Sequence, residues 1–346
     1  MTRGLPGSIK DVIILMSQIG NRYMPHWLTG TLTCLIILFN TLVGIGPMLI
    51  VALLKVAIPL KGFQRHSSRI VMWIAETWAA GVNATINRMT GTHWDIRCEG
   101  TLAPQHSYLV ISNHQSWVDI PALLQAFNRK TPYFKFFLKR ELIWIPFLGL
   151  AFWALDYPFM KRYSKAHLAK FPEDQGKDLE ITRRACRKFS NLPVTIVNYL
   201  EGTRRTPAKH RAQNSPYRHL LKPKSGGVAF VMAALGEQMR SLLDVTIVYP
   251  QGKPPGFWAL VSGQVDRVVI DIRQVELAPE LFSGDYQNDA VFKNRFQKWV
   301  NDLWQTKDQR IEQLHTELFP ANSATHQADR PSAPNQDIEP SASSRD

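Results

Sequence analysis

The sequence predicts an α/β domain in which helices flank a central sheet, preceded by a membrane-embedded helical segment near the N-terminus. After residue 92, short β-branched and aromatic runs alternate with helical patterns, and such alternation is typical of a layered α/β domain. The expected strands are 93–98, 108–112, 133–138, 194–199, 244–249 and 267–272. The expected helices are 117–128, 178–189, 227–240 and 288–318. A long apolar run before this region predicts the membrane segment.

That apolar run covers residues 27–59, and Lys55 is its only charged residue. About 18 or more apolar residues in sequence are typical of a membrane helix rather than of a buried core helix. Gly44, Gly46 and Pro47 lie in the middle of the run, so two shorter helices forming a hairpin are one interpretation and a single tilted span is the other. Basic residues flank both ends, so the charge distribution does not choose between them.

Residues 67–89 follow as an amphipathic helix. Its predicted apolar side consists of Ile70, Trp73, Ile74, Trp78 and Val82. This side could lie on a membrane surface or pack on the domain, and packing is the slightly preferred interpretation.

Composition divides the chain into four parts. We expect a short lead at 1–26, a helical anchor at 27–90, a catalytic-type α/β domain at 91–319 and a disordered tail at 320–346. The tail contains few large apolar side chains, so it cannot bury enough surface to fold alone. Within the domain, residues 203–225 are crowded with basic residues and proline and are expected to form a long basic loop.

The 346-residue chain has a formal net charge of +13. Such a balance favours anionic partners, which include nucleic acid, an anionic membrane surface and phosphorylated substrates. The three cysteines, Cys34, Cys98 and Cys186, are far apart and match no metal-ligand spacing. Their scatter favours a reducing compartment without disulfides.

The first candidate for chemistry is the segment NHQSWVD, which follows an expected strand and begins an expected helix. The edge beyond the carboxyl ends of strands is where α/β proteins place their sites. His114 followed by Asp119 suits general-base catalysis, because the carboxylate can hold one ring nitrogen and leave the other free to accept a proton. The alternative is a capping box, in which Asp119 reaches back to the helix start near Ser116.

The second candidate is the segment EGTR, Glu201 to Arg204, directly after the strand at 194–199. A glycine turn beside a threonine hydroxyl and an arginine guanidinium suits a phosphate group. A solvated basic loop is the alternative. A third segment, FMKR, ends at Arg162, and alone it indicates only a buried strand followed by surface charge.

Taken together, these blocks are identified as those of the PlsC-type glycerolipid acyltransferase (lysophosphatidic acid acyltransferase) superfamily. NHQSWVD resembles the family's NHX4D block, and KREL, FMKR and EGTR follow in the family's order. LLKPKSGG and DVTIVYP resemble later blocks. Phrases such as WALDYPFMKRYS and TIVNYLEGTR are most similar to the bacterial YihG-type branch, and the resemblance covers residues 27–318.

The resemblance implies a mixed, largely parallel central sheet and an enzyme that moves a fatty acyl group from acyl-CoA or acyl carrier protein. The acceptor would be a lysophospholipid hydroxyl, in particular that of 1-acylglycerol-3-phosphate. It also implies a bacterial inner membrane location with the domain facing the cytoplasm, and neither a cofactor, a metal nor a nucleic-acid partner. The implied catalytic residues are His114 and Asp119, and the implied substrate-binding residues are Arg162, Glu201, Gly202, Thr203 and Arg204.

Two departures from the family pattern concern the acceptor head group and the acyl-chain length. The second block here is DYPFMKR, without the usual glycine and isoleucine-rich approach, and the fourth block delays its proline to Pro250.

Two other functions fit the same residues. One is an inactive membrane-tethered binding protein on this fold, and the other is a lysophospholipid hydrolase that uses His114 to activate water. Within the transferase scheme, Ser116 is an alternative acyl-enzyme nucleophile. We expect backbone N–H groups near the start of the Trp117 helix to stabilise the oxyanion.

Overall fold

The computed structural model describes residues 24–145, 148–157, 159–160, 170–171, 193–236, 239, 241–249 and 253–318. Four sequence predictions lie outside these residues. They are most of the lead at 1–26, the helix at 178–189, the tail at 320–346 and the site residue Arg162.

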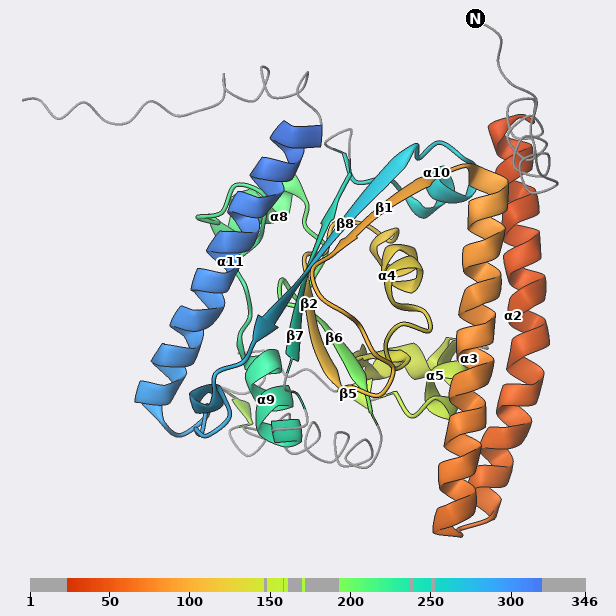
Figure 1. Cartoon of the computed structure of the whole chain (residues 1–346), viewed down its shortest axis with the longest axis horizontal. Coiled ribbons are helices and arrows are strands. Elements are labelled where there is room, and N and C mark those ends of the chain that lie inside the picture. Colours follow the sequence, from red (N-terminus) through yellow and green to blue (C-terminus); the bar gives the residue numbers. More distant parts are fainter. Residues whose placement is uncertain are drawn as a thin grey trace, which may run out of the picture.

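A six-stranded sheet with the order β1-β8-β7-β2-β6-β3 forms the centre of the fold (Figure 1). Its strands are β1 (His93–Cys98), β2 (Tyr108–Ser112), β3 (Phe134–Phe136), β6 (Thr195–Tyr199), β7 (Ser241–Val248) and β8 (Arg267–Glu276). All neighbouring pairs are parallel except β7 and β8. The predicted mixed, largely parallel sheet is therefore confirmed. A second sheet pairs β4 (Leu138–Lys139) with β5 (Phe159–Met160).

Helices cover both faces of the sheet, as Figure 1 shows. The elements α8 (Pro207–Gln213), α9 (Gly226–Leu235) and α11 (Ala290–Leu318) lie on one side. The other side carries α2 (His26–Ala57), α3 (Lys61–Thr90), α4 (Asp119–Phe127) and α5 (Leu148–Ala154). Shorter helical elements are η1 (Arg140–Trp144), α10 (Phe257–Val261) and η4 (Pro279–Leu281).

Alternation along the strands builds two separate cores. In β2, for example, Tyr108 and Val110 join the core beneath α3 and α4, whereas Leu109 and Ile111 join the core beneath α9 and α11. Successive side chains of a strand point to opposite faces, so a strand covered on both sides is apolar throughout. The run YLVIS is fully buried for this reason.

The apolar run forms one continuous helix, α2, of 32 residues with Pro47 inside it. The hairpin interpretation with a break near Gly44 to Pro47 was therefore wrong. The chain turns instead at residues 58–60, and α3 returns alongside α2 (Figure 1). Lys55, the charged residue of the run, forms an ion pair with Asp156 beyond α5.

Among the described helices, α2 is the one long and apolar enough to cross a membrane, with a mean hydropathy of 2.3 over its best window. Only 11% of that window is buried against the protein. At 1.5 Å per residue the helix is about 48 Å long. Length and composition thus make α2 a candidate membrane span.

Helix α3 packs on the domain, and its packed side overlaps the predicted one at Ile74, Trp78 and Val82. The buried stripe is Ser67, Val71, Ala75, Ala79, Val82 and Ile86, together with the last residue Thr90. Of the five predicted positions only Val82 is buried, and Trp73 is largely exposed. Trp78 contacts α2, because its indole N–H donates to the Thr41 hydroxyl at 3.0 Å.

Two further differences concern local structure. The expected strand at 133–138 is divided between β3 and β4, which belong to different sheets. The expected basic loop at 203–225 contains the helix α8. Thr206 caps α8, because its hydroxyl accepts a hydrogen bond from the Lys209 N–H at 3.2 Å. Pro207 follows at the first helical position, where a missing N–H has no cost.

Candidate active site

Three adjacent parallel strands bring the candidate residues together. β2 lies between β6 and β7, with Ser112 in register with Tyr199 on one side and Val245 on the other. Parallel strands place their carboxyl ends at one edge, so the segments that follow β2, β6 and β7 meet there. His114, the EGTR segment and Tyr249 follow these three strands in turn.

Asn113 fixes the start of the loop after β2. Its side-chain amide donates to the carbonyl of Ile247 at 2.9 Å and accepts the Ile247 N–H at 2.9 Å. The fully buried amide thus extends the β2–β7 ladder by one residue. The loop therefore leaves the sheet at a defined angle.

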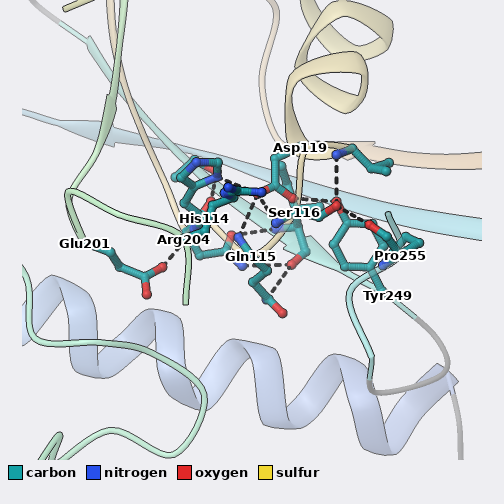
Figure 2. A network of polar contacts seen from close by, with 12 residues as sticks. His114, Gln115, Ser116, Asp119, Glu201, Arg204, Tyr249 and Pro255 are labelled. Carbon is teal, nitrogen blue, oxygen red and sulfur yellow. Dashed lines mark hydrogen bonds and ion pairs between the residues drawn. The ribbon is translucent and has the colours of Figure 1, made fainter. Parts of the chain in front are cut away.

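His114 and Asp119 form the pair that the sequence predicted (Figure 2). His114 Nδ1 lies 2.8 Å from Asp119 Oδ2, and the Asp119 side chain is completely buried, whereas 17% of the His114 side chain is exposed. A carboxylate accepts only, so Nδ1 carries the proton when the imidazole is neutral. Nε2 is then the nitrogen with a free lone pair.

Asp119 also bonds the backbone just before the start of α4. Its Oδ2 accepts the backbone N–H groups of Gln115 at 2.7 Å and Ser116 at 2.9 Å. One carboxylate therefore makes both the contact with the imidazole and the backbone contacts expected of a cap. Three donors on one oxygen hold the side chain in a single orientation.

The imidazole of His114 lies flat against an aromatic stack. Its ring centroid is 4.1 Å from that of Tyr199, with 17° between the planes, and Phe136 lies beyond Tyr199 at 5.7 Å. The stack supports one face of the imidazole, so the ring cannot swing away from Asp119 in that direction.

The Ser116 hydroxyl is occupied by hydrogen bonds to the backbone. Its hydroxyl donates to the carbonyl of Pro255 and accepts the Val118 N–H at 2.9 Å. A hydroxyl held in this way is a cap rather than a nucleophile activated by a neighbouring base.

We expect Ser116→Ala to lower the free energy of unfolding by about 1 kcal/mol, the value of a lost cap, and to retain most of the rate of the acyl transfer that the resemblance implies. Thermal unfolding and a transfer assay on the same preparation measure both effects. Complete loss of transfer in a folded Ser116→Ala protein would instead indicate an acyl-enzyme intermediate.

The expected oxyanion donors are largely used within the loop. The N–H groups of Gln115 and Ser116 bond Asp119, and that of Val118 bonds Ser116. The capping bonds that orient Asp119 thus remove most of the N–H groups at this helix start from the set available to a substrate.

Glu201 lies beneath the loop rather than at an open surface. Its side chain is fully buried, and its two oxygens accept the backbone N–H groups of His114 at 2.8 Å and Leu221 at 3.1 Å. Burial raises the pKa of Glu201 to about 7. Glu201, for which the resemblance implied a substrate contact, thus supports the backbone of His114 and Leu221 in this structure.

The remaining EGTR residues form a basic turn. Gly202 has a φ of +66°, and a Cβ there would lie 3.1 Å from the side chain of Lys224, so glycine suits both the turn and the close approach. The Thr203 hydroxyl accepts a bond from Lys209 Nζ at 2.6 Å. The guanidinium carbon of Arg204 lies 4.5 Å from the ring centroid of Trp117, beside the His114 loop.

Sequence reasoning missed two residues of this site, Tyr199 and Tyr249. Both stand at the ends of predicted strands, at 194–199 and 244–249. The rule that places sites beyond parallel strand ends would have selected them. Their roles nevertheless depend on which ring meets which partner across the sheet.

Comparison with known proteins agrees with this arrangement. Residues 95–250 match the family model described as Acyltransferase, and this region contains His114, Asp119 and the EGTR turn. The region that contains the candidate site is thus similar to the acyltransferase family, and the curated relatives support the PlsC-type glycerolipid acyltransferase superfamily.

Curated members of the superfamily are similar over much of the chain. The 1-acyl-sn-glycerol-3-phosphate acyltransferase 3 of Arabidopsis thaliana is 24% identical over 76% of this chain and 66% of its own length. The mouse 1-acyl-sn-glycerol-3-phosphate acyltransferase gamma is 26% identical over 50% of this chain and 44% of its own length. The chain thus spans less than two thirds of these relatives.

A solved structure, the 1-acyl-sn-glycerophosphate acyltransferase PlsC from Thermotoga maritima, is 20% identical with a TM-score of 0.45. That comparison covers 80% of this chain and 97% of the Thermotoga chain.

Proposed function

We propose that this chain transfers a fatty acyl group from a thioester donor, acyl-CoA or acyl carrier protein, to the free hydroxyl of a lysophospholipid. The proposed acceptor is 1-acylglycerol-3-phosphate, and the product is then phosphatidic acid. The observation that carries the proposal is the His114–Asp119 pair at the sheet edge, with the basic EGTR turn beside it.

In the proposed reaction His114 Nε2 takes the proton from the acceptor hydroxyl while that oxygen attacks the thioester carbonyl. Asp119 holds the Nδ1 proton and stabilises the imidazolium that forms. Collapse of the tetrahedral intermediate expels the thiolate, and the imidazolium can return the proton to its sulfur. A thioester is already activated, so this scheme needs no metal or prosthetic group and no acyl-enzyme.

Positive charge beside His114 supports a phosphate-bearing acceptor. Arg204, Lys209 and Lys224 all lie at the basic turn, and the Arg204 guanidinium lies over the Trp117 ring. A planar guanidinium presents paired donors that match two phosphate oxygens. We propose that Arg204, with Gly202 and Thr203 shaping the turn, binds the acceptor phosphate, and that Arg162 contributes as in the family.

The acceptor is amphipathic, so the site must reach a membrane surface. The exposed apolar side of α2 supports membrane attachment, and the net charge of +13 favours an anionic lipid surface and anionic acyl carriers. We propose that the chain resides in a bacterial inner membrane with its domain in the cytoplasm, where acyl carriers are found.

The test of this function is transfer from labelled acyl-CoA, and separately from acyl carrier protein, to a panel of lysolipid acceptors by the purified full-length protein. Labelled phosphatidic acid from lysophosphatidate supports the proposal, and preference for another lysolipid changes only the acceptor. Release of free fatty acid without any acceptor would identify a hydrolase. Absence of both products would support the inactive binding protein.

Arg204→Lys tests the phosphate contact. The substitution keeps the charge but removes the bidentate fork and the contact of the guanidinium with Trp117. We expect the KM for lysophosphatidate to rise roughly tenfold, the scale of one lost charge-assisted hydrogen bond, while the KM for acyl-CoA stays nearly constant.

Arg211→Lys is the matched control, because Arg211 is an exposed residue of α8 and undergoes the same change. Equal loss of affinity for both substrates in Arg204→Lys would show general damage and contradict the phosphate assignment.

A further inference from the structure

The two oxygens of Asp119 have different partners. Oδ2 contacts the His114 loop, where it bonds the imidazole and accepts two backbone N–H groups. Oδ1 accepts a hydrogen bond from the phenol of Tyr249, which comes from a different strand end, directly after β7 (Figure 2). Tyr249 therefore donates to the carboxylate oxygen that the imidazole does not use.

The environment keeps the Tyr249 phenol a donor. The residue is only 4% exposed. Burial, and next the negative charge of Asp119, raise the pKa of Tyr249 well above its usual range. The hydroxyl therefore stays protonated over the pH range in which enzymes of this kind are assayed, and it donates throughout.

The segment that follows β7 reaches the same loop a second time. The Pro255 carbonyl accepts the Ser116 hydroxyl, one residue before Trp117. Tyr249 and Pro255 thus contact the start of α4 from one side, while Glu201 contacts the His114 backbone from another. The orientation of the pair depends on β7 as well as on β2 and β6.

We propose that Tyr249 is a positioning residue that holds Asp119 in line with His114 and moderates the stabilisation that Asp119 gives to the protonated imidazole. Its catalytic consequence rests on the proposed acyl transfer, whereas its effect on His114 does not. A donor on Oδ1 withdraws charge from the carboxylate, so less charge faces Nδ1. Removal of the donor should make protonated His114 more stable.

Other charged or titratable groups also face this loop. They are Glu201 below the His114 backbone, Tyr199 stacked on the ring, Arg205 whose backbone N–H donates to the His114 carbonyl at 2.7 Å, and Arg204 over Trp117. None of these is changed by a substitution at Tyr249, so a difference between the parent and a Tyr249 variant reports the phenol itself.

The test uses Tyr249→Phe in the full-length protein. The first readout is carbethoxylation of His114 by diethylpyrocarbonate across a pH series, measured by peptide mass spectrometry. The reagent reacts with an imidazole only in its neutral form, so labelling reports the protonation of His114. We expect the pH of half-maximal labelling to rise by about 0.5–1 unit, the scale of one hydrogen bond to a charged group. The second readout is transfer kinetics, in which kcat should fall about tenfold with KM nearly unchanged and the acidic limb of the kcat profile should move in the same direction.

Tyr157→Phe is the matched control, since it removes another buried phenol that donates to a carbonyl, that of Phe134 at 2.7 Å, away from Asp119. It should lower the melting temperature without moving the labelling curve. A second variant, 3-fluorotyrosine at position 249, keeps the ring and the hydroxyl and makes the phenol a stronger donor. It should move the labelling curve downward, which a merely structural role would not do.

An unchanged labelling curve in Tyr249→Phe, or the same shift in Tyr157→Phe, would overturn the proposal. Should Tyr249→Phe fail to fold, the fluorotyrosine protein decides alone, and an upward shift or no shift there would overturn the proposal. A parent protein without transfer activity would contradict the proposed function, while the labelling experiment would still test Tyr249.

Discussion

Replacement of His114 by alanine is expected to lower the rate of acyl transfer by about 10²–10⁴-fold, the usual contribution of a general base. The loop should keep its shape, because the hydrogen bonds that hold it use the backbone of His114 and not its ring. The His114 N–H donates to Glu201, and its carbonyl accepts the Arg205 N–H. The imidazole itself bonds only Asp119 among the described contacts.

The measurement is single-turnover transfer by His114→Ala, compared with the parent at saturating donor and acceptor. A melting temperature and a membrane fraction close to those of the parent are the control for folding. Substantial transfer by a folded His114→Ala protein would remove the proposed mechanism.

Asp119→Asn should lose transfer as His114→Ala does, because an amide can leave the imidazole in the wrong tautomer. It should differ from His114→Ala in its stability. The Asp119 carboxylate also accepts hydrogen bonds from the backbone N–H groups of Gln115 and Ser116 and from the phenol of Tyr249, whereas the His114 ring has no such structural contacts among the described residues. We therefore expect a lower melting temperature in addition to the kinetic loss.

The second large effect concerns membrane attachment. We expect the protein to remain in the membrane pellet after washing with high salt or carbonate and to be released by detergent, because attachment through α2 would rest on apolar burial, which salt does not weaken. Release by salt alone would contradict an embedded helix and leave a peripheral basic protein.

A double substitution tests the same helix directly. Phe39 and Val43 lie one turn apart on α2, 68% and 58% exposed, in the middle of the apolar run. Lysine at both positions would place two charges in the hydrocarbon, at a cost of about 5–7 kcal/mol in all. We expect Phe39→Lys/Val43→Lys to move from the pellet toward the soluble or aggregated fraction.

The control is Val291→Lys, at a position on α11 that is 79% exposed and distant from α2 in Figure 1. Its membrane fraction should match that of the parent. If the double α2 variant is retained as fully as the control, the exposed side of α2 does not face lipid.

The sequence by itself was sufficient for most of the strands and for the contact between His114 and Asp119. A strand that is covered on both faces must be apolar at every position, so β2 appears in the sequence with its observed ends. The edge strand β1, with the sequence HWDIRC, also has the ends that were predicted for it. His114 and Asp119 are five residues apart on one turn, so their contact depends on local geometry. Local geometry is encoded by neighbouring residues, and a motif can therefore report it.

The tertiary structure decided which side of a helix is buried and which hydrogen-bond partners each carboxylate has. On α3, Ala75 and Ala79 are buried whereas Trp73 is largely exposed, a choice that depends on the elements packed against the helix. Glu201 and Tyr249 reach the site from β6 and β7, more than 80 residues away along the chain from His114 and Asp119. Their roles depend on the order of strands in the sheet, and strand order is fixed by contacts between distant residues that no local pattern contains.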